Sequence, residues 1–386
     1  MFGRDPFRRR RQTTWLTALP RLSAAIGLLA TAVIANPAAA QTTVPSPNAV
    51  ESLPVSFQVV NRNDSNVPCL ADGKTYTVRG HLVGPAADLR NPFPRSVTTY
   101  LHGIGWGEFY WHFQSQPEYD YATLMAQRGH TSLVYDQLGY GASDRTPGLL
   151  NCYGSEASVA NQIIGALKTG RYTVVGRTTV PTFAQVALAS NQAAALVSQP
   201  TVYSYSAPLA PNADALIVTS FADFAGAFKP AFALQSAPFF SRCLLGGEPS
   251  DGPGGSGPRF YVNFPPSDEA FASVNFANAD PAIVAAATAA RGRSPCGEAL
   301  SAFQTIGLDS LQILLRQVRV PVLIVNGLDD AFFIQPLGGN AQRRLYPNSP
   351  DVTVAFIANA GQALTLERTA PDFRNVMDAW LRARRF

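Results

Sequence analysis

Charged residues are scarce in this sequence: Asp, Glu, Lys and Arg make up 15% of its 386 residues, whereas 46% are hydrophobic. A chain this apolar can bury a large core, so the composition excludes an intrinsically disordered protein. The net charge of +4 originates at the N-terminus, because residues 1–40 hold six arginines and one acid. The remaining 24 basic and 25 acidic residues nearly cancel. This balance argues against binding nucleic acids through general electrostatics.

The sequence also lacks the motifs of common cofactor sites. It contains no phosphate-binding loop, no dinucleotide-binding glycine pattern and no cluster of metal ligands at a known spacing. We therefore expect neither a cofactor nor a metal. No internal repeat is present, and no apolar run beyond the N-terminus is long enough to span a bilayer.

Cysteines number only four, and their spacing matches no zinc signature. An even number favours disulfides in an oxidising compartment. Four cysteines allow three pairings, and the sequence alone does not choose among them. We expect Cys243–Cys296, because both lie in one segment, with Cys69–Cys152 as the remaining pair. Four buried free thiols are the alternative.

Residues 1–40 have the organisation of a signal peptide. Arg8–Arg11 form a charged start, Leu22–Ile34 form an uncharged run, and Ala38–Ala40 form a small-residue cleavage site. The uncharged run has thirteen residues, whereas a membrane span needs about twenty, so an uncleaved anchor is the less favoured alternative. We expect a secreted or cell-envelope protein with no stable membrane span in the mature chain. Its route, Sec or twin-arginine, stays open.

The rest of the sequence divides into a linker and one domain. Residues 41–55 are rich in Pro, Ser, Thr and Asn and are predicted to be a linker, and we place the domain at residues 56–386. Short apolar runs there alternate with helical stretches, which predicts an α/β fold whose mostly parallel sheet is flanked by helices. This pattern stops between the sixth strand and Val320. We interpret residues 222–319 as an inserted lid over the strand ends, where parallel sheets bind ligands.

Eight strands and four helices are expected within this domain. The expected strands are Ser56–Val60, Thr75–Val83, Val97–Leu101, Thr131–Asp136, Val186–Ala189, Ala213–Ser220, Val320–Asn326 and Val352–Ile357. The expected helices are Tyr119–Arg128, Ala157–Leu167, Ala193–Ser198 and Asp372–Arg384.

Four short motifs follow predicted strands in a fixed order. A His-Gly turn lies at Leu101–Gly107, and an Asp-x-x-Gly-x-Gly-x-Ser-Asp turn lies at Asp136–Asp144. Asn326–Asp330 contains Gly-x-x-Asp, and Asn359–Leu364 reads Asn-Ala-Gly-Gln-Ala-Leu. Together these motifs resemble those of the α/β-hydrolase superfamily, from about Ser56 to the C-terminus. The resemblance implies an esterase- or lipase-like site for a small molecule.

The resemblance also implies roles for individual residues. The turn of His102, Gly103 and Ile104, together with Ala193, corresponds to the oxyanion region, where backbone N–H groups face a developing negative charge. Asp330 stands at the position of the triad acid, which orients a histidine and stabilises it when protonated.

The other two triad positions carry glutamine. With Val186–Ala189 as the fifth strand, the turn that follows places Gln192 at the nucleophile position, and Gln362 stands at the base position. A glutamine amide is a poor nucleophile and does not titrate near neutral pH. In a serine protease, removing the nucleophile or the base costs roughly a million-fold in turnover. We therefore expect a protein that binds a ligand and turns it over very slowly at most.

An alternative alignment shifts the turn by two residues and makes Ser190 the nucleophile of an active esterase or lipase. This alignment supplies no recognised base, because all four histidines, His81, His102, His112 and His130, precede Ser190. His102 alone ends a strand on the expected side of the sheet. A hydrogen bond to the turn backbone is its favoured role, and service as an unusual base is the alternative.

An aromatic cluster follows the His-Gly turn. We expect it to pack in the core, with a wall for an apolar ligand as the alternative. Its members are Trp106, Phe109, Tyr110, Trp111, Phe113, Tyr119 and Tyr121. The sequence thus predicts an exported, non-catalytic protein that binds a small apolar or carbonyl-containing ligand in the position of an active site. An active secreted serine hydrolase is the alternative, and a surface that binds a partner through the lid is a third hypothesis.

Overall fold

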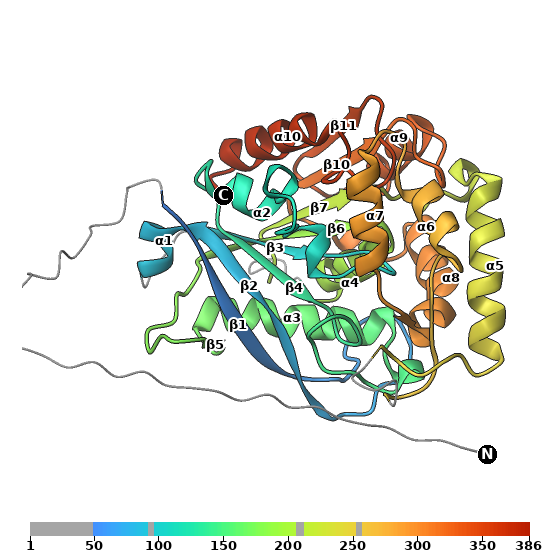
Figure 1. Cartoon of the computed structure of the whole chain (residues 1–386), viewed down its shortest axis with the longest axis horizontal. Helices are drawn as coiled ribbons and strands as arrows, with labels where there is room; N and C mark the ends of the chain where they lie inside the picture. Colours follow the sequence, from blue (N-terminus) through green and yellow to red (C-terminus); the bar gives the residue numbers. More distant parts are fainter. Residues whose placement is uncertain (1–48, 92–95, 206–211, 252–256) are drawn as a thin grey trace, which may run out of the picture. The chain divides into compact units, whose positions relative to one another are not determined.

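The computed structural model describes residues 49–91, 96–205, 212–251 and 257–386 (Figure 1). The predicted signal peptide and most of the predicted linker lie outside these residues. In the described part, nine strands form one sheet in the order β11-β10-β7-β6-β3-β4-β2-β1-β5. The strands are β1 (Val50–Val60), β2 (Thr75–Pro85), β3 (Ser96–Leu101), β4 (Ser132–Asp136), β5 (Thr173–Val174), β6 (Gln185–Asn191), β7 (Ala215–Thr219), β10 (Val322–Gly327) and β11 (Val352–Ile357).

The sheet is mixed but mostly parallel. Strands β4, β3, β6, β7, β10 and β11 run parallel to one another, whereas β2, β1 and β5 join through antiparallel pairs. Every residue of β4, β7 and β10 is buried. Such strands are apolar on successive positions because helices cover both of their faces. The predicted α/β fold is thereby confirmed.

Strand β1 begins earlier than the sequence analysis predicts. It starts at Val50 and pairs with β2 from Val50↔Pro85 to Val60↔Thr75, so residues 50–55 belong to the sheet and not to the linker. The Pro and Ser residues here have the composition of a linker, but buried and outward-facing positions alternate along the segment. That period of two is the property of a strand with one buried face.

Helices cover both faces of the sheet. On one face lie α3 (Tyr153–Thr169), α4 (Ala195–Tyr205) and α9 (Leu337–Arg343), and on the other lie α2 (Tyr121–Ala126) and α10 (Ala370–Ala383). Figure 1 shows α3 and α10 on opposite sides of the strands. Successive side chains of a strand point to opposite faces, so β3, β4, β6, β7 and β10 each contribute to two separate apolar clusters.

The described residues between β7 and β10 form four further α-helices and a short strand pair. The helices are α5 (Pro230–Leu244), α6 (Asp268–Asn275), α7 (Pro281–Ala290) and α8 (Cys296–Ser310). Strands β8 (Tyr261–Val262) and β9 (Ser294–Pro295) pair with each other in antiparallel fashion. None of the helices in the described ranges has the length and hydropathy needed to cross a bilayer.

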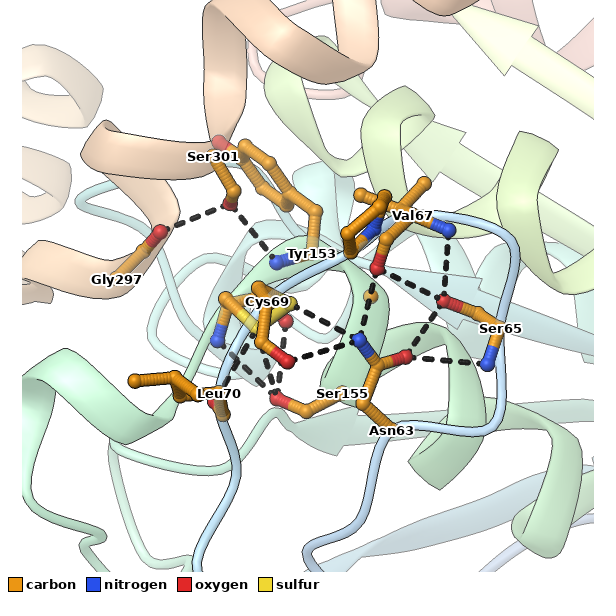
Figure 2. Close-up of a disulfide and its surroundings, with 12 residues drawn as sticks. Asn63, Ser65, Val67, Cys69, Leu70, Tyr153, Ser155, Gly297 and Ser301 are labelled. Atoms are coloured by element: carbon orange, nitrogen blue, oxygen red, sulfur yellow. Dashed lines mark hydrogen bonds between the residues drawn. A yellow bond between two sulfur atoms is a disulfide. The ribbon is translucent and has the colours of Figure 1, made fainter.

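Both disulfides have the expected pairing. Cys243 in α5 is bonded to Cys296, the first residue of α8, with their Cα atoms 5.4 Å apart. Cys69 in the loop after β1 is bonded to Cys152, directly before α3. Figure 2 shows the second bond beside Asn63, whose Nδ2 donates to the Cys69 carbonyl oxygen at 3.1 Å. The two bonds therefore fasten α5 to α8 and the β1–β2 loop to α3.

Candidate functional site

Gln192 stands at the apex of a sharp turn between a strand and a helix. Strand β6 ends at Asn191, a short 3-10 turn covers Gln192–Ala194, and α4 begins at Ala195. The φ angle of Gln192 is 53°, in the left-handed region that non-glycine residues seldom adopt. This geometry is that of the turn on which α/β-hydrolases present their nucleophile. The small side chains of Ala194 and Ala195 are buried where α4 approaches the sheet.

The amide of Gln192 is held by hydrogen bonds on both of its polar atoms. Its Oε1 accepts from Trp106 Nε1 at 3.1 Å, and its Nε2 donates to Gln362 Oε1 at 2.9 Å and to Asn275 Oδ1. A Cβ atom at Gly103 would lie 2.5 Å from Gln192 Oε1, so the amide rests directly against the glycine turn. Both amide hydrogens of Gln192 are therefore engaged, and the side chain fills the space beside Gly103.

Gln362 continues these contacts to Asp330. Its Nε2 donates to Asp330 Oδ1 at 2.9 Å, and both side chains are buried. The same Asp330 oxygen accepts from the backbone N–H groups of Phe332 and Phe333 at 2.7 and 3.0 Å. The side chains of Asp330, Gln362 and Gln192 thus form one hydrogen-bonded row, in the order acid, base position, nucleophile position.

The carboxyl group of Asp330 lies in an unusual electrostatic environment. Burial raises its pKa to about 6, and the donors on Oδ1 oppose that rise by stabilising the charged form. Its Oδ2 is buried and has no hydrogen-bond partner among the described residues. The neutral amides of Gln362 and Gln192 do not titrate near neutral pH, so this row contains no base beside the turn.

Ser190, the alternative nucleophile, does not lie on the turn. It belongs to β6 and is fully buried. Its hydroxyl bonds to Ser198 Oγ at 2.8 Å and to the Ile217 carbonyl oxygen at 3.2 Å. The side chain therefore fastens β6 to α4 and β7 and is not presented to a ligand. The structure does not support the alignment that made Ser190 the nucleophile.

None of the four histidines, all of which lie in the described ranges, forms a hydrogen bond or ion pair with Ser190 or Asp330. His102 Nδ1 lies 3.0 Å from the Gly103 carbonyl oxygen, and its Nε2 accepts from the Gln137 N–H at 3.1 Å. Burial lowers the pKa of His102, which agrees with a neutral ring held by the turn backbone. The other histidines pair with carboxylates, as His81–Glu108, His112–Asp120 and His130–Asp378. Across the described ranges, no three His, Cys, Asp or Glu side chains are grouped to hold a metal ion.

An apolar pocket opens beside the two glutamines. Gln192 and Gln362 line it together with Ile104 and Ala193. The pocket encloses about 580 Å³ of empty space, including its mouth. Its walls are formed mainly by Phe221, Phe232, Phe239, Phe240, Phe264, Phe303, Phe332 and Phe333. A narrow space with such walls suits a slender apolar chain better than a bulky polar ring.

Sequence reasoning missed these phenylalanines and Asn275. Phe232, Phe239 and Phe240 lie on one face of α5, at the spacing of seven and eight residues that places side chains together on a helix. That spacing is a signal that the sequence offers. The aromatic cluster after the His-Gly turn instead packs mainly in the core, as Trp111 does against Tyr121. Of its members, Trp106 reaches the glutamine row.

The parallel sheet, the helices on both faces and the positive-φ turn after β6 define the α/β-hydrolase fold, and this chain has that fold. Comparison with solved structures agrees. An esterase from Thermogutta terrifontis superposes with a TM-score of 0.55 at 15% identity, covering 85% of this chain and 98% of the esterase. The enol-lactonase from Burkholderia xenovorans LB400 gives 0.54 at 14%, covering 79% and 96%.

A bromoperoxidase from Bacillus anthracis gives a TM-score of 0.54 at 16% identity, covering 84% of this chain and 100% of the bromoperoxidase. No family model matches the chain, and no curated protein matches it either. At these identities the structural neighbours show a shared fold, and the chemistry has to be inferred from the residues of this site.

Proposed function

We propose that this chain is an exported protein of α/β-hydrolase fold that binds a small apolar or carbonyl-containing ligand without hydrolysing it. The observation that carries the proposal is the hydrogen-bonded row of Asp330, Gln362 and Gln192, in which amides occupy the two positions where catalysis needs a hydroxyl and an imidazole. Both amides of the row are held by hydrogen bonds on each of their polar atoms, which favours a fixed structural role over proton transfer.

The absence of a nucleophile at the turn has a large expected effect. An attacking group at position 192 needs a lone pair of useful basicity and a neighbour that accepts its proton. The Gln192 amide has neither, because its nitrogen lone pair is delocalised into its own carbonyl group and its neighbour Gln362 is also an amide. The loss of nucleophile or base costs roughly a million-fold, so hydrolysis by this site should be negligible.

The pocket determines which ligand is proposed. Phenylalanines form most of its wall, and the two glutamines supply polar atoms at one end. This combination favours an acyl chain or a similar apolar ligand with its carbonyl group near the glutamines. Two structural neighbours are named an esterase and an enol-lactonase, and esters and lactones both contain a carbonyl group. We further propose that residues 222–319, which contribute α5 and α8 to the wall, serve as the lid of this pocket.

Two features support export. The first 40 residues have the organisation of a signal peptide, and both cysteine pairs form disulfides that persist in oxidising compartments. Because the described cysteines are all paired, no free thiol remains among them. We therefore propose a location outside the cytoplasm.

Two assays on the purified protein test the proposal. Hydrolysis of p-nitrophenyl butyrate should stay at the rate of the buffer blank, and dansyl-undecanoic acid should gain fluorescence as it enters the pocket. Displacement of the dansyl probe by undecanoic acid identifies specific binding. Ester hydrolysis that disappears in Ser190→Ala would instead establish the active serine hydrolase.

A further inference from the structure

The outer face of α5 is apolar. Its exposed positions include Ala233, Leu234, Ala237 and Leu244, and these recur at the spacing that places residues on one side of a helix. The exposed fractions of Leu234 and Leu244 are 70% and 76%, and the next residue, Leu245, is 86% exposed. The solvent side of a surface helix normally carries polar residues, so an apolar one indicates a binding surface.

Helix α8 extends this surface. Phe303 is 55% exposed and stacks on Phe240 of α5 with ring centroids 4.8 Å apart, so the two helices meet along their outer sides. Figure 1 shows α5 and α8 as neighbours, and the Cys243–Cys296 bond joins them. We name the combined surface the α5–α8 face. Its exposed apolar residues are Leu234, Leu244, Leu245, Leu300, Phe303 and Leu311.

The exposed charged residues of the segments that form the α5–α8 face have one sign. The exposed charged residues of these segments are Arg242 in α5 and, after α8, Arg316 and Arg319. The acids of these segments, Glu298 and Asp309, are buried at 2% and 0% exposure. The next acids after Leu245 are Glu248 and Asp251, and both pair with Arg293. The segments of the face therefore combine exposed leucines with arginines, and these neighbouring carboxylates are already paired.

This charge pattern distinguishes between two occupants. A second copy of the chain would bring the same arginines together without any acid to pair with them. An anionic lipid surface would neutralise them, at about 1 kcal/mol per arginine near the membrane, while the leucines enter its apolar layer. The pattern favours the lipid surface.

A groove along α5 adjoins the pocket. Phe232, Ser236, Phe240 and Phe303 line both the groove and the pocket beside the glutamines. An apolar chain that leaves a bilayer at this face would meet the pocket at these shared side chains.

We propose that the α5–α8 face docks on the surface of a bilayer that contains anionic lipid, and that the pocket takes an acyl chain through the groove. The docking stands on the surface residues alone, whereas the acyl chain rests on the proposed function of the pocket. The two parts are therefore tested separately.

Sedimentation with vesicles tests the docking. The full purified protein should bind vesicles of equimolar phosphatidylcholine and phosphatidylglycerol more strongly than vesicles of phosphatidylcholine alone. Replacing two leucines in the variant Leu234→Gln/Leu244→Gln should weaken partitioning roughly a hundredfold, because each leucine loses its transfer into the apolar layer. The matched control Leu328→Gln/Leu337→Gln changes exposed leucines outside the face and should bind like the parent protein.

A second pair of variants tests the charge. Arg242→Gln/Arg316→Gln should reduce binding to the anionic vesicles about thirty-fold, whereas Arg171→Gln/Arg385→Gln, exposed elsewhere, should not. Absence of vesicle binding, or equal binding by face and control variants, would overturn the proposal. Self-association of the parent protein that the leucine variants abolish, without vesicle binding, would identify the face as an interface between copies.

A pocket variant separates docking from ligand binding. Ala302 lies on α8 and lines the pocket, so Ala302→Trp should block uptake of dansyl-undecanoic acid and leave vesicle sedimentation unchanged. Full uptake by this variant would refute the acyl-chain pocket without affecting the docking. Loss of sedimentation in folded Ala302→Trp would show that the occupied pocket, and not the α5–α8 face, determines vesicle binding.

Discussion

Glu298 of α8 and Glu156 of α3 form a buried carboxyl pair that should make the stability of the protein depend on pH. The Tyr140 hydroxyl donates to Glu298, with distances of 2.9 and 2.8 Å to its two oxygens. Burial raises the pKa of Glu298 to about 7 from its ordinary 4.5. Burial and the negative charge of Glu298 raise the pKa of Glu156 well above its usual range. Burial in the contact between α3 and α8 therefore favours the protonated form of both carboxyl groups.

The sign and size of the effect follow from the pKa of Glu298. A carboxyl group whose pKa is raised by folding stabilises the folded state fully at pH values below its unfolded pKa, and this contribution is lost as the pH rises through the folded pKa. For Glu298 that window runs from 4.5 to about 7. At 1.36 kcal/mol per pKa unit, the loss is about 3 kcal/mol.

Urea unfolding of the parent protein and Glu298→Gln at pH 5 and pH 8 measures this contribution. The amide mimics the protonated carboxyl group, so the variant should lose about 2.5 kcal/mol less than the parent between the two pH values, because pH 5 already lies above the unfolded pKa. The exposed residue Glu118 supplies the control, because Glu118→Gln makes the same charge change on the surface. An equal pH dependence in Glu298→Gln and the parent protein would refute the reasoning.

Two further predictions concern the site and the disulfides. Asp330→Ala should lower the free energy of unfolding by roughly 3 kcal/mol, because the Gln362 amide and two backbone N–H groups lose their acceptor. Urea titration measures this loss. The exposed neighbour supplies the control, since Asp329→Ala should change the free energy of unfolding little. Cys69→Ser/Cys152→Ser should cost about 4.5 kcal/mol, because the bond closes a loop of 83 residues. Calorimetry of the oxidised parent and this variant measures the loss; equal melting temperatures would contradict it.

Motifs at strand ends were the most predictable part of the molecule. The turns around His102 and Asp330, and the two glutamines at positions 192 and 362, lie where local sequence and the order of strands place them. The strand-to-helix turn at Gln192 is a local structure fixed by a few residues, so its position follows from the strand that precedes it. The hydrogen bonds that join Gln192, Gln362 and Asp330 could not be predicted, because they link segments far apart in the sequence.

The pocket wall and the buried Glu156–Glu298 pair could not be predicted from the sequence. The pocket wall combines α5, α8 and the residues after Asp330, and which helix faces contact each other depends on packing between distant segments. The Glu156–Glu298 pair likewise joins two helices far apart in the chain. The start of strand β1 was mispredicted for a different reason. Residues 50–55 alternate between buried and outward-facing positions, as a strand does, but their composition is that of a linker.

Rebuilding the missing hydroxyl and imidazole tests the central claim most directly. In Gln192→Ser/Gln362→His, the hydroxyl would stand on the positive-φ turn and the imidazole beside Asp330. A fluorophosphonate probe followed by peptide mass spectrometry should label position 192 in the double variant and leave the parent protein unlabelled. Labelling of the parent protein at Ser190 would contradict the account.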